Sequence, residues 1–453
     1  MEDDKKIPND KMGLRKLLSY GAGDFGLTAC FSFLSGFILF FMTDYMGIRA
    51  GVAGTVLMLS RVLDALTDVW IGNAVDRTKS RFGKARPWLL VCALPFAVSF
   101  ILLFSVPNLG PAGRLIWFIV LYNLTTTVFY AALVIPYDAL IPLMTRNAAS
   151  RIHCGVVRTI MSIVGGVAFV SLTMPVVNAL GGDARAWRIW SVIVGLFMLL
   201  CVMIAFVLTR ERYGGEKKTR DAPRTFTQSY KSLISNKYWI LLTMALVGSN
   251  IAVSITGAGA VFYFRYILGN ENLMGLASLS MSATLVVVLF LVPVLSKRFS
   301  KGTLARISVL GGLAAPLVLM ISPASLGLYV VRAAIHGVFT APFVAVSFAM
   351  AADVSDYGYW KTGMKCEGIV NTATGFGIKL GVGIGTGMLG WILELGGFVA
   401  DGYAQPDSAR FALMFVMMGV PIIMAVINFG LLFFYRLDKA HPQIMADIRR
   451  MEG

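Results

Sequence analysis

Two aspartates, Asp64 and Asp68, lie one helical turn apart inside a long apolar stretch, and Arg61 lies three residues before Asp64. Residues three and four positions apart share one helix face, so the three charged groups are neighbours if the stretch is helical. Ionised carboxylates at this spacing repel one another, and a proton, a bound cation or a basic partner relieves the repulsion. Carboxylate oxygens also suit hard cations. The spacing predicts a cation-coupling site; a structural ion pair between Arg61 and Asp64 is the alternative.

Three further charged residues, Asp24, Arg158 and Lys379, interrupt other apolar stretches. An ionisable residue in hydrocarbon is costly, and it commonly marks a substrate path or a pairing partner. Arg158 can bind a solute hydroxyl or carboxylate through forked hydrogen bonds. Lys379 can balance the charge of the aspartate pair, and Asp24 either binds solute or pairs with a basic residue that holds helices together. Charge neutralisation alone is the alternative for the two cations.

Oppositely charged residues gather where apolar stretches meet the basic loops. Ion pairs exposed to water contribute about 0–1 kcal/mol each, and weak pairs suit a gate whose two states must be close in free energy. The sequence therefore predicts a cytoplasmic gate, with a solvated face as the alternative. Its candidate residues are Asp138, Asp353, Asp356 and Lys365. Candidates for a polar solute cavity are Asp24, Thr28, Tyr130, Arg158, Asn371, Thr372 and Thr374, and Thr67 joins the candidate cation site.

The elements that position these residues are long apolar stretches. The chain is 57% hydrophobic and 14% charged, whereas soluble domains carry about 25% charged residues. A spanning helix needs about 20 mainly apolar residues. The pattern predicts an all-α polytopic membrane protein of twelve spans, near residues 20–45, 50–75, 87–107, 113–140, 152–179, 187–209, 237–268, 273–296, 303–322, 326–353, 367–396 and 409–435.

The distribution of basic residues orients these spans. A net charge of +16 could indicate nucleic-acid binding, but most Lys and Arg residues lie in short segments between the apolar stretches. That pattern is typical of cytoplasmic loops. We therefore expect a multi-pass protein of the bacterial cytoplasmic (inner) membrane with both termini in the cytoplasm. The lipid bilayer is an expected partner, and nucleic acid is not.

A polar segment at residues 210–236 divides the spans into two groups of six. We expect an N-terminal half at 1–209, a cytoplasmic linker, and a C-terminal half at 237–453. The halves are alike in their loops, because the second-to-third and eighth-to-ninth connections are both basic. Two similar six-helix halves are the layout of a major-facilitator transporter, whose solute site lies between the halves near the bilayer midplane.

Stretches along most of the chain resemble the glycoside–pentoside–hexuronide:cation symporter family, which is melibiose permease-like and belongs to the major facilitator superfamily. The resemblance implies a major-facilitator fold and symport of a sugar with H+, Na+ or Li+. It also implies that Asp64 and Asp68 are the cation-site carboxylates, that Lys379 lies beside them, and that Arg158 belongs to the sugar site. The matching residues are Tyr20–Gly26, Asp64–Asp68, Asp76–Trp88, Ile135–Tyr137, Arg158, Ala352–Gly358, Lys361, Cys366–Glu367 and Lys379.

The chain departs from the family pattern near the ion. Thr67 stands where the melibiose permease has an asparagine, and Ala131 stands where it has a cation-lining threonine. These departures favour H+ over Na+ as the coupling ion, and both stay open. If the ion is Na+, Asp64 and Asp68 are the expected metal ligands.

The sugar site departs further. Thr28 and Val134 correspond to the permease's two galactoside-binding aspartates, and Asp138 and Val344 correspond to its stacking tryptophans. A galactoside would lose its partners here, so we do not expect melibiose. Fewer acids around Arg158 and Lys379 leave a more positive cavity, which suggests a substrate that can be anionic, such as a hexuronide or another acidic glycoside.

Three other classes compete with a sugar symporter. A lipid or lysolipid transporter of the same fold needs an apolar lateral opening, whereas the polar candidates above favour a hydrated sugar cavity. A membrane enzyme is not expected, because the sequence carries no recognisable nucleophile–base pair, metal-ligand set or phosphate loop, and no cofactor is implied. A receptor or channel fits two similar halves less well than alternating access does. The expected partners are a sugar-like solute and a coupling cation, and no obligate protein partner is inferred.

Overall fold

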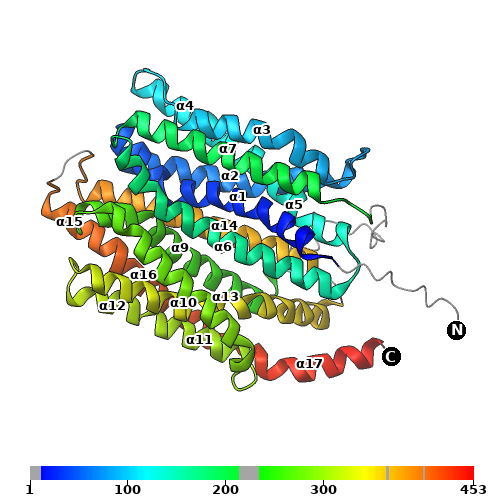
Figure 1. Cartoon of the computed structure of the whole chain (residues 1–453). Helices are drawn as coiled ribbons and strands as arrows, with labels where there is room; N and C mark the ends of the chain where they lie inside the picture. The colour runs from blue at the N-terminus through cyan, green and yellow to red at the C-terminus, as the bar shows by residue number, and fades with distance from the viewer. Residues whose placement is uncertain (1–11, 214–233, 364–366, 401–403, 453) are drawn as a thin grey trace. The chain divides into compact units, whose positions relative to one another are not determined.

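A computed structural model describes residues 12–213, 234–363, 367–400 and 404–452 (Figure 1). In these ranges all regular structure is helical, and twelve helical spans are long and apolar enough to cross a membrane. The predicted all-α fold of twelve spans is thereby confirmed. The spans are Leu14–Tyr45, Ala50–Arg77, Arg86–Leu103, Pro111–Met144, Ala149–Ala179, Ala184–Leu208, Lys237–Tyr266, Glu271–Leu295, Lys301–Ile321, Leu326–Thr362, Ala373–Leu395 and Asp407–Arg450.

The chain forms two compact units, which are not the same as a simple division at the linker. One contains Met1–Arg49 with Leu59–Lys218, and the other contains Ala50–Met58 with Thr219–Gly453. The helix Ala50–Arg77 is therefore divided between the units: its N-terminal part, to Met58, belongs to the second unit and the rest belongs to the first. Most of the expected linker, 214–233, lies outside the described residues.

The first unit is built around its first helix. That helix, α1, packs against α6 and α7, and α3 packs against α7. Glycines permit this close approach, because a Cβ on Gly165 of α6 would lie 2.6 Å from the carbonyl oxygen of Phe25 on α1. The helices are α1 (Leu14–Phe40), α2 (Ala50–Arg77), α3 (Arg86–Leu103), α4 (Pro111–Asn123), α5 (Ala131–Met144), α6 (Ala148–Ala179) and α7 (Ala184–Leu208).

Two spans of the first unit contain π-helical segments. One, Phe41–Tyr45, extends α1, and the other, Leu124–Tyr130, joins α4 to α5 in one continuous span. π-Helical turns inside α-helices are often found at functional sites. The second segment bears on function here, because it comes directly before the part of α5 that carries Asp138.

The second unit packs α9 against α14 and α16, while α10 and α11 pack against α13 (Figure 1). Side-chain caps begin several helices; for example, the Asn236 side chain accepts a hydrogen bond from the Trp239 backbone at the start of α9. The helices are α9 (Lys237–Tyr266), α10 (Met274–Leu295), α11 (Lys301–Gly312), α12 (Ala314–Ile321), α13 (Leu326–Thr362), α14 (Glu367–Leu395), α15 (Asp407–Met414), α16 (Val420–Phe434) and α17 (Leu437–Glu452).

The N-terminal part of α2 meets α14 closely within the second unit. A Cβ on Gly54 would lie 2.7 Å from the carbonyl oxygen of Gly387. The backbone N–H of Gly51 donates to the Glu394 carboxylate, and the Trp391 indole donates to the Thr55 hydroxyl over 2.9 Å. Glycines on both helices therefore allow a backbone-to-backbone seam that two polar contacts hold.

Two helical features extend beyond the predicted spans. Helix α13 continues to Thr362 rather than ending near residue 353, and it ends at Gly363, whose φ of 66° suits a left-handed helix cap. Helix α17 lies beyond the last predicted span, in the C-terminal segment that the sequence predicts to be cytoplasmic. Both additions carry charged residues, so a search for apolar stretches does not detect them.

Candidate functional site

Both carboxylates on α2, those of Asp64 and Asp68, have interaction partners. Arg61 Nη1 lies 3.7 Å from Asp64 Oδ2, and both side chains are buried. The guanidinium also lies over the Phe31 ring, 5.3 Å from its centroid, a cation–π geometry. Asp68, one turn further along, is half-buried and has interactions of its own. The conformation described thus contains the Arg61–Asp64 ion pair, and a cation entering here has to compete with Arg61 for Asp64.

Thr67 lies between the two aspartates and connects α2 to the π-helical segment. Its hydroxyl is within hydrogen-bond distance of two backbone carbonyls, those of Asp64 at 3.0 Å and Thr127 at 3.2 Å. A hydroxyl has one proton to donate and two lone pairs that can accept. The Thr67 oxygen therefore has its proton directed at the backbone and keeps acceptor capacity.

A second charged cluster joins three helices of the first unit. Arg158 on α6 lies between Asp24 of α1, at 3.4 Å from Nε to Oδ1, and Asp138 of α5, which forms a closer ion pair with Nη2. The Asp24 side chain is 10% exposed and the Asp138 side chain is 53% exposed. One guanidinium thus serves two carboxylates, so the three formal charges sum to one negative charge.

Two stacked tyrosines form a wall of this cluster. The Tyr20 and Tyr137 rings are nearly parallel with centroids 4.7 Å apart, and the Arg158 guanidinium lies 5.5 Å from the Tyr137 centroid. The Tyr137 hydroxyl accepts a hydrogen bond from the backbone N–H of Asp24 over 3.1 Å. Tyr20 donates to the Tyr137 carbonyl oxygen over 3.2 Å. The tyrosines therefore fix the position of Asp24 and Arg158 as well as supplying flat aromatic surface.

Sequence reasoning did not single out Tyr137 as a site residue. The available signal was the tripeptide Ile135–Tyr137, in which a proline interrupts an apolar span directly before the tyrosine. It also missed Ser162, whose hydroxyl lies 2.8 Å from that of Thr28. A small hydroxyl residue inside an apolar helix gives little signal, because such residues also occur at ordinary membrane-helix contacts.

Tyr130 contacts the aromatic ring over which Arg61 lies. Its ring stacks on Phe31 with centroids 5.2 Å apart and lies 6.0 Å from Phe96. Phe31 is the same ring over which Arg61 lies. A displacement of Arg61 can therefore reach Tyr130, an expected solute-site residue, through two ring contacts.

The remaining candidates lie in the second unit. Lys379 is half-buried on α14 and has an interaction partner. Thr374 is buried, and its hydroxyl donates to the Val370 carbonyl oxygen over 2.7 Å. Lys365 lies outside the described residues, as do the side chains of Asn371 and Thr372.

The gate candidates have different partners from one another. Asp138 belongs to the Arg158 cluster of the first unit. Asp353 pairs with Lys301 of α11, and Asp356 pairs with His441 of α17. In the described part of the chain, Asp138 and Asp353 thus form ion pairs with Arg158 and Lys301, and Asp356 contacts the His441 imidazole; each contact lies within one unit.

Comparison with known proteins gives the family. The family model described as "MFS/sugar transport protein" matches residues 19–439. The isoprimeverose transporter of Lactiplantibacillus pentosus is 31% identical over 444 residues, covering 95% of this chain and 90% of the relative. The inner membrane symporter YicJ of Escherichia coli is 29% identical, with 92% and 90% covered. The glucuronide carrier protein homolog of Escherichia coli is 27% identical, with 97% and 96% covered.

Solved structures agree on the fold. A D-xylose–proton symporter matches with a TM-score of 0.68 at 11% identity, covering 94% of this chain and 98% of that chain. A bacterial homolog of the human lysosomal transporter Spinster, in an inward-facing and unoccupied conformation, matches with a TM-score of 0.71 at 14% identity, covering 94% and 97%. At these identities the likeness concerns the fold alone.

These matches confirm the family and fold that the sequence predicted, and they agree with a multi-pass protein of the inner membrane rather than an enzyme family. The match runs through residues 19–439, so the Arg61–Asp64 pair and the Arg158 cluster lie inside the family region, whereas His441 lies just beyond it. The chain belongs to the MFS/sugar transport protein family, within the glycoside–pentoside–hexuronide:cation symporters of the major facilitator superfamily.

Proposed function

We propose that the protein is a secondary active symporter that imports a sugar or sugar derivative together with a cation by alternating access. The observation that carries this proposal is the Arg158 cluster, in which a guanidinium, two carboxylates and two tyrosines meet on three membrane helices. Ionisable residues within membrane spans are rare and commonly mark solute or ion pathways. Sugar hydroxyls both donate and accept hydrogen bonds, so they match a site with both kinds of partner.

The solute site proposed here comprises Arg158, Asp24 and Thr28, with Tyr130 and the C-terminal residues Asn371, Thr372 and Thr374 as further candidates. Arg158 already has its charge balanced by two carboxylates. An acidic glycoside would therefore have to displace Asp138 or Asp24, whereas a neutral glycoside could bind without breaking an ion pair. The acidic substrate expected from sequence stays a prediction, and uptake competition by neutral and acidic glycosides separates the two.

The cation site proposed here comprises Asp64, Asp68 and Thr67, with Lys379 as a regulating charge. Arg61 holds Asp64 when no cation is present, and arrival of H+ or Na+ changes the charge balance on α2 and releases Arg61. The contact of Arg61 with Phe31, and of Phe31 with Tyr130, gives a physical route from ion binding to the solute site. Coupling energy of this kind is typically about 1–3 kcal/mol.

The transport cycle needs contacts that can separate. Asp138, Asp353, Asp356 and Lys365 are proposed as cytoplasmic gate residues, in halves at 1–209 and 237–453 joined by a linker at 210–236, with both termini in the cytoplasm. The seam between Gly54 and Gly387 supports a role for α2 and α14 in the same cycle, because a contact made through glycine backbone closes tightly and has few side-chain interactions to break.

The test is uptake into proteoliposomes under an imposed H+ or Na+ gradient. The double variant Asp64→Asn, Asp68→Asn should lose concentrative uptake and retain solute exchange, because its α2 face no longer binds a cation. The variant Asp44→Asn is a matched control, since Asp44 is also a buried membrane-helix acid but lies outside both clusters. Undiminished accumulation by the double variant would exclude the proposed coupling site.

A lipid or lysolipid transporter of the same fold is not favoured. The likeness to the Spinster homolog shows the fold only, whereas the curated relatives that match along the chain are named for isoprimeverose, raffinose and a glucuronide.

A further inference from the structure

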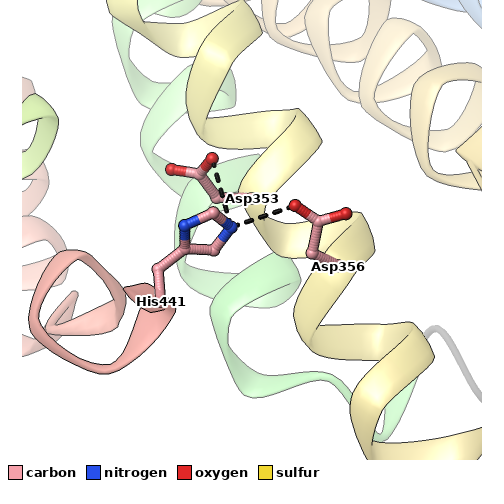
Figure 2. Close-up of side chains that lie close together, drawn as sticks. All are labelled: Asp353, Asp356 and His441. Carbon is pink, nitrogen blue, oxygen red and sulfur yellow. Dashed lines mark hydrogen bonds and ion pairs between the residues drawn. The ribbon is translucent and has the colours of Figure 1, made fainter. Parts of the chain in front are cut away.

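Three potential metal ligands converge between α13 and α17 in the second unit (Figure 2). His441 Nε2 lies 2.9 Å from Asp356 Oδ2 and 3.6 Å from Asp353 Oδ1. One ligand atom from each of the three residues lies within 4.8 Å of both others. We propose that Asp353, Asp356 and His441 form a site for a divalent transition-metal ion of the Zn2+ class, which fastens α17 to α13.

The positions of the two aspartates follow from helix geometry. Asp353 and Asp356 are three residues apart on α13, so their side chains lie on one face. Asp353 is only 5% exposed and Asp356 is partly exposed. The site thus has one fixed, buried carboxylate and one that can adjust from the edge, an arrangement that lets the ligands close on an ion without moving the helix.

His441 is directed toward α13 by the apolar face of α17. The buried residues Leu437, Ile444 and Ile448 pack in the same core cluster as α13 residues such as Val354. His441 comes four residues after Leu437 and three before Ile444, so it belongs to the same helical stripe. Hydrophobic packing along that stripe therefore places an imidazole against the aspartates, and the placement does not depend on the ion pairs alone.

The distances suit a metal ion. Ligand atoms about 2.0–2.2 Å from a tetrahedral Zn2+ are about 3.3–3.6 Å apart from one another. Of the two separations from His441 Nε2, 3.6 Å lies at the upper end of that range and 2.9 Å lies a few tenths of an ångström below it. Three protein ligands leave one position for water, as in zinc sites that are not fully enclosed.

The ligand types select the class of ion. Imidazole nitrogen suits Zn2+, Ni2+ and Cu2+, whereas Mg2+ and Ca2+ prefer sites made of oxygen alone. Two carboxylates and one imidazole, without thiolate, therefore favour a borderline divalent ion. This site is separate from the coupling-cation site on α2, which offers no imidazole.

Lys301 is the cation that competes with a metal ion. Its ammonium group lies 2.7 Å from both oxygens of Asp353, and its side chain is 39% exposed. Two carboxylates and one lysine leave one negative charge, so the cluster still attracts a cation. Removal of the lysine charge should make that attraction stronger, and this effect distinguishes a metal site from a purely structural ion-pair network.

The experiment measures Zn2+ binding to the full-length protein in lipid nanodiscs, with any affinity tag removed, by competition with a chromophoric zinc chelator. His441→Ala and Asp356→Asn should each weaken binding at least about tenfold. His153→Ala is the matched control, because His153 is an exposed histidine on α6 of the other unit, and it should leave the affinity unchanged. Equal Zn2+ affinity in the native protein and in both ligand variants would overturn the proposal.

Two further measurements distinguish loss of a metal ligand from loss of folding. Lys301→Met should tighten Zn2+ binding by at least roughly fivefold, the effect of removing a unit charge about 4 Å away, while Lys301→Arg should not. Lower pH should weaken binding, because the metal requires a deprotonated imidazole. A lack of tightening in Lys301→Met, in a protein whose thermal unfolding is intact, would also overturn the proposal. None of these measurements uses a sugar or an ion gradient, so their failure is distinguishable from failure of the symport mechanism.

Discussion

The charged clusters around Arg158 in the first unit and around Asp353 in the second pair their carboxylates with basic groups in different ways. At Arg158 a single cation serves two carboxylates, while Asp353 contacts both Lys301 and His441, and Asp356 contacts His441. A shared cation cannot be removed without leaving two acids uncompensated. Asp353 has two basic neighbours, so one of them can be removed while the other stays in place. The comparison predicts that the charged groups around Arg158 depend on one another for stability. Around Asp353, loss of one basic partner is partly compensated by the other.

The largest effect is expected from Arg158→Gln. Asp24 then loses its charged partner while it stays buried, and breaking a buried pair in this way costs about 3–5 kcal/mol. We expect loss of uptake and a lower thermal unfolding midpoint of the purified protein. Arg158→Gln combined with Asp24→Asn should recover much of the midpoint but not the uptake. If Arg158→Gln unfolds at the same temperature as the native protein, the three charged groups do not depend on one another for stability.

Lys301→Gln should have a smaller effect on stability than Arg158→Gln. Asp353 is buried, but His441 Nε2 lies 3.6 Å away and can take over part of the role of the lysine. A partly exposed pair of this kind contributes about 1 kcal/mol. Thermal unfolding of Lys301→Gln and of Lys301→Gln, His441→Gln tests this, because the double variant should lose more than the sum of the two single changes. If the losses in the two single variants sum to the loss in the double variant, His441 does not compensate for Lys301.

Asp138→Asn should affect the Arg158 cluster less than Asp24→Asn does. Both acids pair with the same guanidinium, but the Asp138 side chain is five times as exposed as that of Asp24, at 53% against 10%. Water therefore compensates the loss of Asp138 more fully. Unfolding midpoints of the two variants give the order directly, and a larger loss in Asp138→Asn would show that solvent exposure does not govern this cluster.

The smallest effect is expected from Tyr137→Phe. The change removes the hydroxyl that accepts from the Asp24 backbone N–H and keeps the stacked ring. One hydrogen bond is worth about 0.5–1.5 kcal/mol. Tyr263→Phe is a control for loss of a buried tyrosine hydroxyl outside the first unit, because the Tyr263 hydroxyl donates to the Pro323 carbonyl oxygen over 2.7 Å. We expect a modest change in sugar affinity for Tyr137→Phe and none for the control, as measured by substrate competition.

Much of the fold was predictable from sequence, because hydrocarbon selects for apolar stretches of a definite length and the loops carry the basic residues. The apolar pattern identified all twelve spans. It did not identify α17, whose Lys439, Asp447 and Arg449 make it too charged for a span, although Leu437 and Ile444 form a buried stripe. A short amphipathic helix is recognised by periodicity rather than by total hydrophobicity.

Less of the site could be predicted. Spacing along one helix places Arg61 and Asp64 on a common face, and the ion pair between them is a local contact of this kind. Spacing says nothing about which helices are neighbours. Asp138 was therefore assigned to a gate because it follows an apolar stretch, although its side chain reaches Arg158 on another helix. Contacts between side chains on different helices depend on how the helices pack. The spacing of residues along a single sequence does not reveal that packing.

The π-helical segment Leu124–Tyr130 has a consequence for how this helix tolerates changes in length. A π-helical turn accommodates one residue more than an α-helical turn does. Deletion of a single residue there could be absorbed by conversion of the turn to α-helix, so that Tyr137 and Asp138 keep their orientation. The same deletion inside α5 would rotate everything that follows by about 100°. Length variation between this protein and other transporters should therefore be concentrated at this turn.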